Sequence, residues 1–279
     1  MSQQHQLPSE DVPLADGMPM LGLGTWQNED GEQCAESVET ALEMGYRHVD
    51  TAQAYGNEEA VGEGIANADV DREDVFLATK VWIDNLSHDD VINSTEESLD
   101  ELGVDYVDLL YIHWPSGDYD PEETLGAFDQ LHDNGKIERV GVSNSEPEHV
   151  REAKEAADAP IFANQIEMHP LLQQEELREC AAEEGVELVA YSPLARGGVM
   201  DDDTLGEIAE KHDASAVQVS LAWLREKGVT AIPKATSEEH IRDNWESLAV
   251  DLDEEDVATI DEMSPGDRKI HPDFAPDAW

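Results

Sequence analysis

Short apolar runs alternate along the chain with longer segments in which apolar residues recur every three or four positions. Several runs are nearly continuous in apolar and β-branched residues, which is typical of parallel strands covered on both faces. The longer segments have the spacing of amphipathic helices. The predicted strands are "MLGLG", "HVD", "VFLATK", "VDLLYIHW", "RVGVSN", "IFANQIEM", "ELVAYS" and "VTAIPK".

A helical segment follows each predicted strand, and several end at a glycine, the residue that most often takes the left-handed conformation after a helix. Eight strand–helix units predict an α/β fold with a closed (β/α)₈ barrel rather than an open doubly wound sheet. The expected helices span 32–45, 57–67, 88–102, 122–134, 146–157, 174–184, 203–228 (as two helices) and 238–248, and the glycines are Gly45, Gly103, Gly135, Gly185 and Gly228.

Three further segments lie outside this repeat. "LPSEDVPLADGMPM", before the first strand, predicts a small N-terminal hairpin over the barrel floor. The segment 253–263 predicts an extra helix, and "RKIHPDFAPDAW" a short irregular C-terminal tail that the pattern does not place over the mouth or elsewhere. No linker or change of composition divides the chain, so we expect a single domain over residues 1–279.

The charge balance is strongly acidic, since 66 Asp and Glu residues oppose 16 Lys and Arg, a formal net charge of −50. Ordinary soluble domains carry a net charge of magnitude about 2–8. The acids spread through every predicted helix and loop, which indicates a folded protein with an acidic surface that repels nucleic acid and anionic membranes. The excess predicts a halophilic host, in which salt near 1 M screens the repulsion over a Debye length of about 3 Å.

No apolar run is long enough to span a bilayer, and "MSQQHQLPSED" at the start is too polar for a signal peptide. Cys34 and Cys180 lie in separate helical segments and match no metal-binding spacing, so we expect buried free thiols. These observations predict a cytoplasmic protein.

Polar and aromatic residues stand at the carboxyl ends of the predicted strands, where (β/α)₈ enzymes carry their active sites. Most have a structural alternative, because a strand-end Asp often caps the next helix and a lone His or Tyr is often only packed. The residues are Thr25, Trp26, Asp50, Lys80, His113, Trp114, Ser143, Asn144, Gln165, Tyr191 and Lys234.

Lys80 is the hardest to explain by structure alone, because it is one of seven lysines and ends the apolar run "VFLAT". A buried lysine needs an anion, and Asp50 at the neighbouring strand end is the candidate. A lysine beside Tyr55 would lower the pKa of the phenol and make it a better proton donor near neutral pH. His113 would orient a polar substrate atom or share the proton. The set predicts a proton-transfer site without a metal, a nucleophilic serine or a glycine-rich phosphate loop.

In eight segments the chain closely resembles the aldo-keto reductases. The segments are "LGLGTW", "HVDTAQAYGNEEAVGEGI", "LATKVW", "DYVDLLYIHWP", "GKIERVGVSN", "NQIEMHP", "VAYSPLA" and "IPKATSEEHIRDN". They run in order, with family-like spacing, from the first strand to the last barrel helix, so the resemblance is very specific. The short tail and the short loop after "HWP" resemble the compact prokaryotic members.

The resemblance implies a (β/α)₈ oxidoreductase that uses a nicotinamide cofactor, with Asp50, Tyr55, Lys80 and His113 as the catalytic residues. Tyr55 would protonate the carbonyl oxygen while the cofactor delivers hydride to the carbonyl carbon. Lys80, held by Asp50, would lower the pKa of the phenol, and His113 would position the carbonyl.

The resemblance also implies the residues that bind the cofactor and the substrate. Ser143, Asn144 and Gln165 would bind the nicotinamide carboxamide, and the Tyr191 ring would stack on the nicotinamide. Ser192 and Leu194 would line the pyrophosphate path. The other implied cofactor residues are Thr25, Trp26, Lys234, Ser237, His240 and Asn244, and Trp26, Trp82 and Trp114 would form an apolar substrate mouth, or else only pack at the barrel rim.

The segment "IPKATSEEHIRDN" departs from the family pattern at two positions. Lys234 matches the residue that faces the adenosine 2′-phosphate, and Ser237 and Asn244 also match. Ala235 stands where many NADPH-preferring members have serine, and His240 where they usually have arginine. Lysine with a neutral histidine holds a phosphate less firmly than lysine with a guanidinium. We therefore expect NADP(H), and use of NAD(H) stays open.

The expected reaction is reduction of the carbonyl of small aldehydes, ketones or keto-sugars. One alternative is an alcohol or sugar dehydrogenase that runs mainly in the oxidative direction. Another is a cofactor-binding regulatory subunit, because the fold also resembles the β subunits of potassium channels. The expected partner is a small carbonyl compound, and we expect neither nucleic acid, nor a membrane, nor an obligate protein partner.

Overall fold

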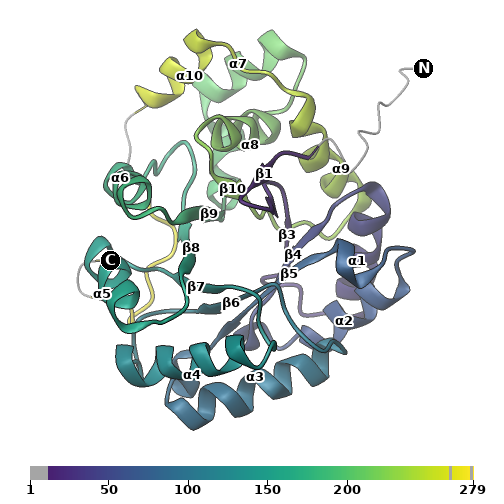
Figure 1. Ribbon diagram of the computed structural model, residues 1–279. Helices are drawn as coiled ribbons and strands as arrows, with labels where there is room; N and C mark the ends of the chain where they lie inside the picture. Colours follow the sequence, from purple (N-terminus) through teal and green to yellow (C-terminus); the bar gives the residue numbers. More distant parts are fainter. Residues whose placement is uncertain (1–11, 264–265, 277–278) are drawn as a thin grey trace.

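Eight short parallel strands form one sheet that curls back on itself in the computed structural model, which describes residues 12–263, 266–276 and 279 (Figure 1). The strands follow one another around the sheet in chain order, each parallel to its neighbour. Parallel bridges from Leu21 to Ala231 and from Gly24 to Lys234 join the first strand to the last. The strands are β3 (Leu23–Gly24), β4 (His48–Asp50), β5 (Phe76–Val81), β6 (Leu109–Ile112), β7 (Val140–Ser143), β8 (Ile161–Glu167), β9 (Glu187–Tyr191) and β10 (Thr230–Ala231).

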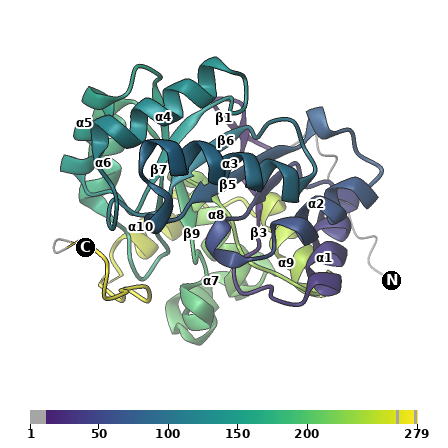
Figure 2. The ribbon, with the colours of Figure 1, turned by 90° about the horizontal axis from the view of Figure 1, so that it is seen from below.

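Helices surround this sheet, and the two views in Figures 1 and 2 show them outside the strands. Each predicted helix is present with ends that differ by at most two residues from the expected ones, and 203–228 forms two helices as predicted. The helices are α1 (Gly31–Met44), α2 (Glu58–Asn67), α3 (His88–Leu102), α4 (Pro121–Asp133), α5 (Pro147–Ala156), α6 (Glu175–Glu184), α7 (Asp203–His212), α8 (Ala216–Glu226), α9 (Glu238–Glu246) and α10 (Glu254–Asp261).

Local sequence explains where several helices begin and end. The Asp120 side chain accepts a hydrogen bond from Glu123 N, and Pro121 occupies the first turn of α4, where its missing N–H costs nothing. Gly103 ends α3 with φ +67°, a conformation that other residues adopt only at a cost. The eight parallel strands with their helices confirm the expected (β/α)₈ architecture, and Gly103 ends α3 as predicted.

The barrel floor is closed by a hairpin of β1 (Leu14–Ala15) and β2 (Met18–Pro19). Met18 is fully buried and packs inside the barrel against the side chains of Phe76, Leu109 and their neighbours. The predicted hairpin is thus confirmed from residue 12 onward, and the part over 7–11 lies outside the described residues. A second, larger apolar core fills the space between the sheet and the helices.

The pairing register brings the strand ends to one rim of the barrel. Asp50 is level with Ala78 on β5, and Ser143 is level with Gln165 on β8. Because carboxyl ends of parallel strands meet at the same edge, the polar residues that follow them converge on one mouth.

Within the described ranges, no helix is both long and apolar enough to cross a bilayer. Cys34 and Cys180 are buried free thiols, as expected.

Candidate active site

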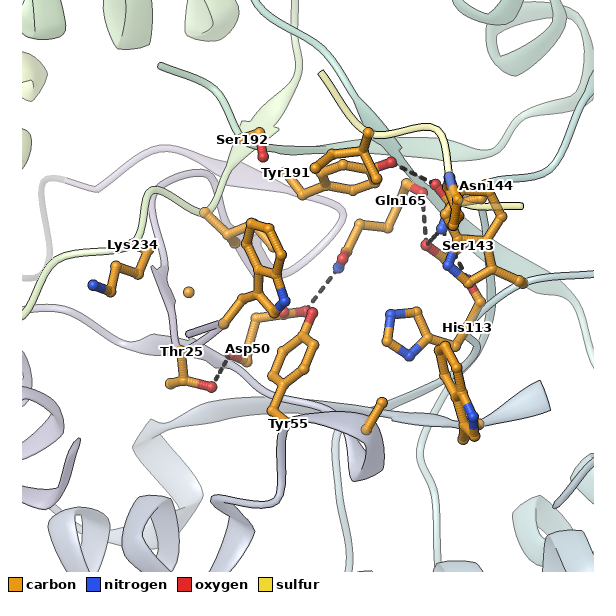
Figure 3. Close-up of a pocket in the computed structure, with 18 of the residues that line it drawn as sticks. Thr25, Asp50, Tyr55, His113, Ser143, Asn144, Gln165, Tyr191, Ser192 and Lys234 are labelled. Atoms are coloured by element: carbon orange, nitrogen blue, oxygen red, sulfur yellow. Dashed lines mark hydrogen bonds between the residues drawn. The ribbon is translucent and has the colours of Figure 1, made fainter. Parts of the chain in front are cut away.

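A cavity of about 510 Å³ opens at the carboxyl ends of the strands. Its volume is in the range of small-molecule sites. Figure 3 shows polar side chains from several strand ends pointing into it. The lining residues are Gly24, Thr25, Trp26, Asp50, Ala54, Tyr55, Trp82, His113, Trp114, Ser143, Asn144, Gln165, Tyr191, Ser192, Ile232, Lys234, Ile270, Pro272 and Phe274.

Lys80 lies beneath this cavity with no exposed surface, and the predicted ion pair is present. Its Nζ donates to Asp50 Oδ1 at 2.5 Å and to the carbonyl oxygen of Thr51 at 2.7 Å. A third, longer bond of 3.4 Å reaches the Tyr55 hydroxyl. Burial lowers the pKa of Lys80, and the charge of Asp50 opposes that shift. The carboxylate therefore keeps a cation next to the phenol.

Asp50 is itself held from two further directions. Gln165 Nε2 donates to Asp50 Oδ2 at 2.7 Å, a bond drawn in Figure 3. The Thr25 hydroxyl donates to the Asp50 carbonyl oxygen at 3.1 Å. These bonds tie the ends of β3, β4 and β8 together and give the carboxylate a single orientation toward Lys80.

A one-turn 3₁₀ helix, η2 (Gln53–Tyr55), carries Tyr55 into the cavity. Gln53 fixes this turn, since its Oε1 accepts from Trp82 N at 3.0 Å and its Nε2 donates to the Ser98 hydroxyl at 3.2 Å. The buried Asn57 accepts from the Thr51 hydroxyl and donates to the carbonyl oxygen of Thr25. Gln53 and Asn57 were not singled out from the sequence, where an amide in a loop gives no sign of its partners.

The expectation of a lowered pKa for Tyr55 is wrong for this structure, because other influences outweigh Lys80. Burial raises that pKa well above its usual value, and the negative charge of Asp50 raises it further. Asp50 neutralises Lys80 from 2.5 Å, whereas the phenol oxygen lies 3.4 Å from the ammonium. The hydroxyl therefore stays protonated at neutral pH, and it accepts from Lys80, so its own hydrogen is available to the cavity.

His113 stands beside Tyr55, with ring centroids 5.8 Å apart, and edge-on to Trp82 at 5.1 Å. Burial lowers the pKa of His113 well below its usual value, and the charge of Lys80 lowers it further. The imidazole is therefore neutral, with one N–H to donate. Its Nδ1 is buried and has no hydrogen-bond partner in the described part of the chain.

Four predicted cofactor residues at the ends of β7, β8 and β9 form a connected group, in which Asn144 Nδ2 also donates to the Ser143 hydroxyl at 3.0 Å. Asn144 is central, because its Nδ2 donates to the carbonyl oxygen of His113 at 2.9 Å and its Oδ1 accepts from the Tyr191 hydroxyl at 2.7 Å. The Ser143 hydroxyl donates to the carbonyl oxygen of Gln165 at 2.8 Å. The Tyr191 ring faces the cavity (Figure 3). The four residues are thus held in place by one another.

The expected phosphate-binding residues are only partly gathered. Ser192 and Lys234 line the cavity, and Lys234 is exposed. Leu194 lies on the loop after β9 and is not among the lining residues. Three others lie at or on α9, outside that lining: Ser237 caps its N-terminus and accepts from His240 N at 3.3 Å, and Asn244 is buried. Their predicted contacts with a cofactor stay predictions.

The C-terminal tail covers one side of the mouth, a position that the sequence pattern left open. Ile270, Pro272 and Phe274 line the cavity. The Phe274 ring stands edge-on to Trp82 at 5.3 Å and to Trp114 at 5.6 Å. In the sequence, the one feature that could have indicated this position is the pair of aromatic residues in "DFAPDAW". Trp26 also lines the cavity, with the guanidinium of Arg196 5.0 Å from its ring.

No group of three or more His, Cys, Asp or Glu side chains suited to a metal ion occurs among residues 12–263, 266–276 and 279. The chemistry that the cavity offers is instead a protonated phenol, a neutral imidazole and a buried ammonium–carboxylate pair. This combination is chemically able to donate a proton to an electronegative atom and to stabilise the phenolate that is left.

Comparison with known proteins agrees with this geometry. The sequence model of the Aldo/keto reductase family matches residues 20–265. The chain is 40% identical over 261 residues to a glyoxal reductase of Bacillus subtilis (strain 168). The aligned region covers 93% of this chain and 94% of the relative.

Two solved structures are similar over nearly the whole chain. One is a putative 2,5-diketo-D-gluconic acid reductase B, with a TM-score of 0.90, 39% identity and 94% of each chain covered. The other is an aldo-keto reductase of Bombyx mori in complex with NADP, with a TM-score of 0.86, 32% identity, and 94% of this chain and 96% of that one covered. The matched family model, these relatives and the site geometry together show that the chain belongs to the aldo/keto reductase family.

Proposed function

We propose that this chain is an NADP(H)-dependent reductase that converts small aldehydes, ketones or keto-sugars to alcohols, with Tyr55 as the proton donor. The observation that carries the proposal is the buried Lys80, whose Nζ lies 2.5 Å from Asp50 Oδ1 and 3.4 Å from the Tyr55 hydroxyl beneath the cavity. The relatives named glyoxal reductase and methylglyoxal reductase support this class of substrate.

Each of three side chains would have a separate role in proton transfer. The Tyr55 oxygen accepts from Lys80 and donates its hydrogen to the carbonyl oxygen of the substrate. As that proton leaves, negative charge develops on the phenol oxygen, where the Lys80 ammonium stabilises it. The neutral His113 donates its N–H to the same carbonyl oxygen and fixes the approach of the substrate. When bound, a reduced nicotinamide supplies the hydride.

Free positive charge at one end of the cavity fits such a cofactor. Within the described ranges Lys234 forms no ion pair, although the chain carries 66 acidic residues. An uncompensated cation in so acidic a protein suits a phosphate group. Lys234 would therefore bind the 2′-phosphate, with Ser237, His240 and Asn244 around the adenosine. Because His240 replaces an arginine fork, we propose NADP(H) as the main cofactor, with weaker discrimination against NAD(H).

At the other end, the amide and hydroxyl groups of Ser143, Asn144 and Gln165 would hold the nicotinamide carboxamide, with the Tyr191 ring against the nicotinamide. Thr25, Trp26, Ser192 and Leu194 would line the path of the pyrophosphate. Trp82 and Trp114 would contact the apolar part of the substrate, and Trp26 would reach both ligands.

The acidic composition supports a further proposal about the setting. A net charge of −50 is tolerable where salt screens the repulsion between carboxylates, so we propose a halophilic host, a prokaryotic one, and a cytoplasmic location. Thermal unfolding of the purified protein tests the proposed adaptation to high salt. We expect the midpoint of unfolding to rise steeply between low and molar KCl.

A panel of aldehydes with NADPH or NADH in molar KCl, beside the variant Tyr55→Phe, tests the proposed function. We expect NADPH oxidation by the wild type, and a loss of kcat of about 10²–10⁴-fold in the variant, the usual contribution of a general acid. Cofactor affinity should be unchanged. Absence of turnover from a wild type that binds NADPH tightly would contradict the proposal and favour a regulatory cofactor-binding role.

A further inference from the structure

Glu167, the last residue of β8, has no exposed surface and binds the backbone of the C-terminal tail. Its Oε1 accepts from Lys269 N at 2.7 Å, and its Oε2 accepts from Ile270 N at 2.9 Å. His169 Nε2 lies 3.2 Å from Oε1. Both oxygens of one buried carboxyl group are thus committed to two consecutive tail residues and a histidine.

These contacts are stronger than ordinary loop hydrogen bonds. In the described part of the chain neither a lysine nor an arginine forms an ion pair with Glu167, and the ammonium of the adjacent Lys269 pairs with Asp267 instead. A buried carboxylate is costly unless hydrogen bonds compensate it. The tail amides supply that compensation, and charge-assisted bonds of this kind are about twice as strong as neutral ones.

The two bound amides lie at the start of the part of the tail that lines the cavity, and Ile270 carries one of them. Ile270, Pro272 and Phe274, here called the tail wall, face the substrate mouth. At its far end the tail wall is held by the Ser116 hydroxyl, which donates to the carbonyl oxygen of Phe274 at 2.7 Å. Glu167 itself is not a lining residue, and the hydrogen bonds of its carboxylate reach the cavity wall through the tail.

We propose that Glu167 is a positioning residue that sets substrate selectivity by holding the tail wall in place. The inference rests on the proposed carbonyl reduction. We expect a small substrate bound at Tyr55 and His113 to make little contact with the tail wall. A larger aromatic aldehyde would extend past Trp82, whose ring contacts both His113 and Phe274, so a displaced wall would weaken its binding selectively.

The variant Glu167→Gln isolates this role, because glutamine keeps the size of the side chain. Its amide offers one acceptor oxygen, and its NH₂ group would face a backbone N–H, so one tail bond is lost. Asp129→Asn is the matched control. The Asp129 carboxylate also binds two consecutive backbone amides, Asp158 N at 2.9 Å and Ala159 N at 2.8 Å, but just before β8, at the opposite end of the strand.

Hydrogen exchange of the free protein and steady-state kinetics are then compared in molar KCl. We expect faster exchange in the peptide that covers 266–276 in E167Q and unchanged exchange there in D129N. For 4-nitrobenzaldehyde the KM of E167Q should rise about five- to tenfold, the effect of one hydrogen bond of ordinary net strength. The KM and kcat for methylglyoxal, and the Kd of NADPH, should stay within about twofold, below the effect of one hydrogen bond.

Three results would overturn the proposal: unchanged exchange over 266–276, an equal rise of KM for both aldehydes, or the same kinetic change in D129N. If the wild type reduces neither aldehyde, the proposed function fails, and the exchange data alone still decide whether Glu167 holds the tail. If E167Q does not fold, E167D, which keeps the charge but shortens the reach by one methylene, is measured with the same expectations.

Discussion

Replacing Asp50 by asparagine removes the charge that faces Lys80 while keeping the shape of the side chain. The side chains of Lys80 and Asp50 are 0% and 2% exposed, and their charged atoms are 2.5 Å apart. In the variant, Lys80 keeps its bond to the carbonyl oxygen of Thr51 but loses its only ion pair among the described residues. The perturbation therefore leaves a buried cation without an anion.

The expected cost is large and depends on pH. Removing one partner of a buried ion pair costs about 3–5 kcal/mol of unfolding free energy. Lysine reduces this cost by releasing its proton. Burial already lowers the pKa of Lys80, and Asp50 is the main influence that raises it, so the pKa falls further in the variant.

The sign of the pH dependence follows from proton binding. At a pH below the pKa that Lys80 has in the folded variant, its side chain is protonated in both the folded and the unfolded protein. The loss of unfolding free energy in the variant is then at its maximum. Between the pKa of Lys80 in the variant and that in the wild type, the variant gains stability relative to the wild type at up to about 1.4 kcal/mol per pH unit. The deficit of D50N should therefore shrink as the pH rises.

Urea unfolding in molar KCl at several pH values, monitored by circular dichroism, measures this deficit. The double variant D50N/K80M, which removes both charges, should cost less than D50N and show no comparable pH dependence. A D50N deficit below about 1 kcal/mol, or one that does not change with pH, would refute the assignment of a charged, buried Lys80.

Two further predictions concern pH and salt. Because burial and Lys80 lower the pKa of His113, kcat/KM should show no acidic limb near its usual pKa of about 6.5, and a limb there that disappears in H113N would contradict a neutral imidazole. Because a chain of charge −50 repels a polyanionic cofactor, the Kd of NADPH should fall as KCl rises from low to molar concentration, as measured by fluorescence titration of samples shown to be folded. Tight binding at low salt, or steady weakening with added salt, would be inconsistent with that electrostatic reasoning.

Much of the fold follows from local patterns in the sequence. The continuous apolar runs correspond to strands buried on both faces, and the helices end close to the expected positions because caps and glycines mark them. The last strand shows the limit of this reasoning. "VTAIPK" predicted six residues of strand, whereas β10 contains only Thr230 and Ala231. This segment pairs with the first strand only through the isolated bridges Leu21–Ala231 and Gly24–Lys234, among the described residues.

The part of the site that could be predicted from the sequence consists of residues at strand ends, because the barrel places these ends on a common rim. Asp50 and Lys80 meet as expected, because neighbouring parallel strands end side by side. The direction of the Tyr55 pKa shift was not predictable, since it depends on burial and on distances to two opposite charges. The tail has no helical or strand period, so contacts made by Glu167 and by the aromatic rings around Phe274 determine its position.

Single-turnover oxidation of enzyme-bound NADPH by methylglyoxal, in wild type and Y55F, tests the central claim most directly because it separates the chemical step from product release. The account predicts that Y55F binds NADPH with the wild-type Kd and transfers hydride about 10²-fold more slowly or worse. A single-turnover rate within about threefold of the wild type would contradict Tyr55 as the proton donor.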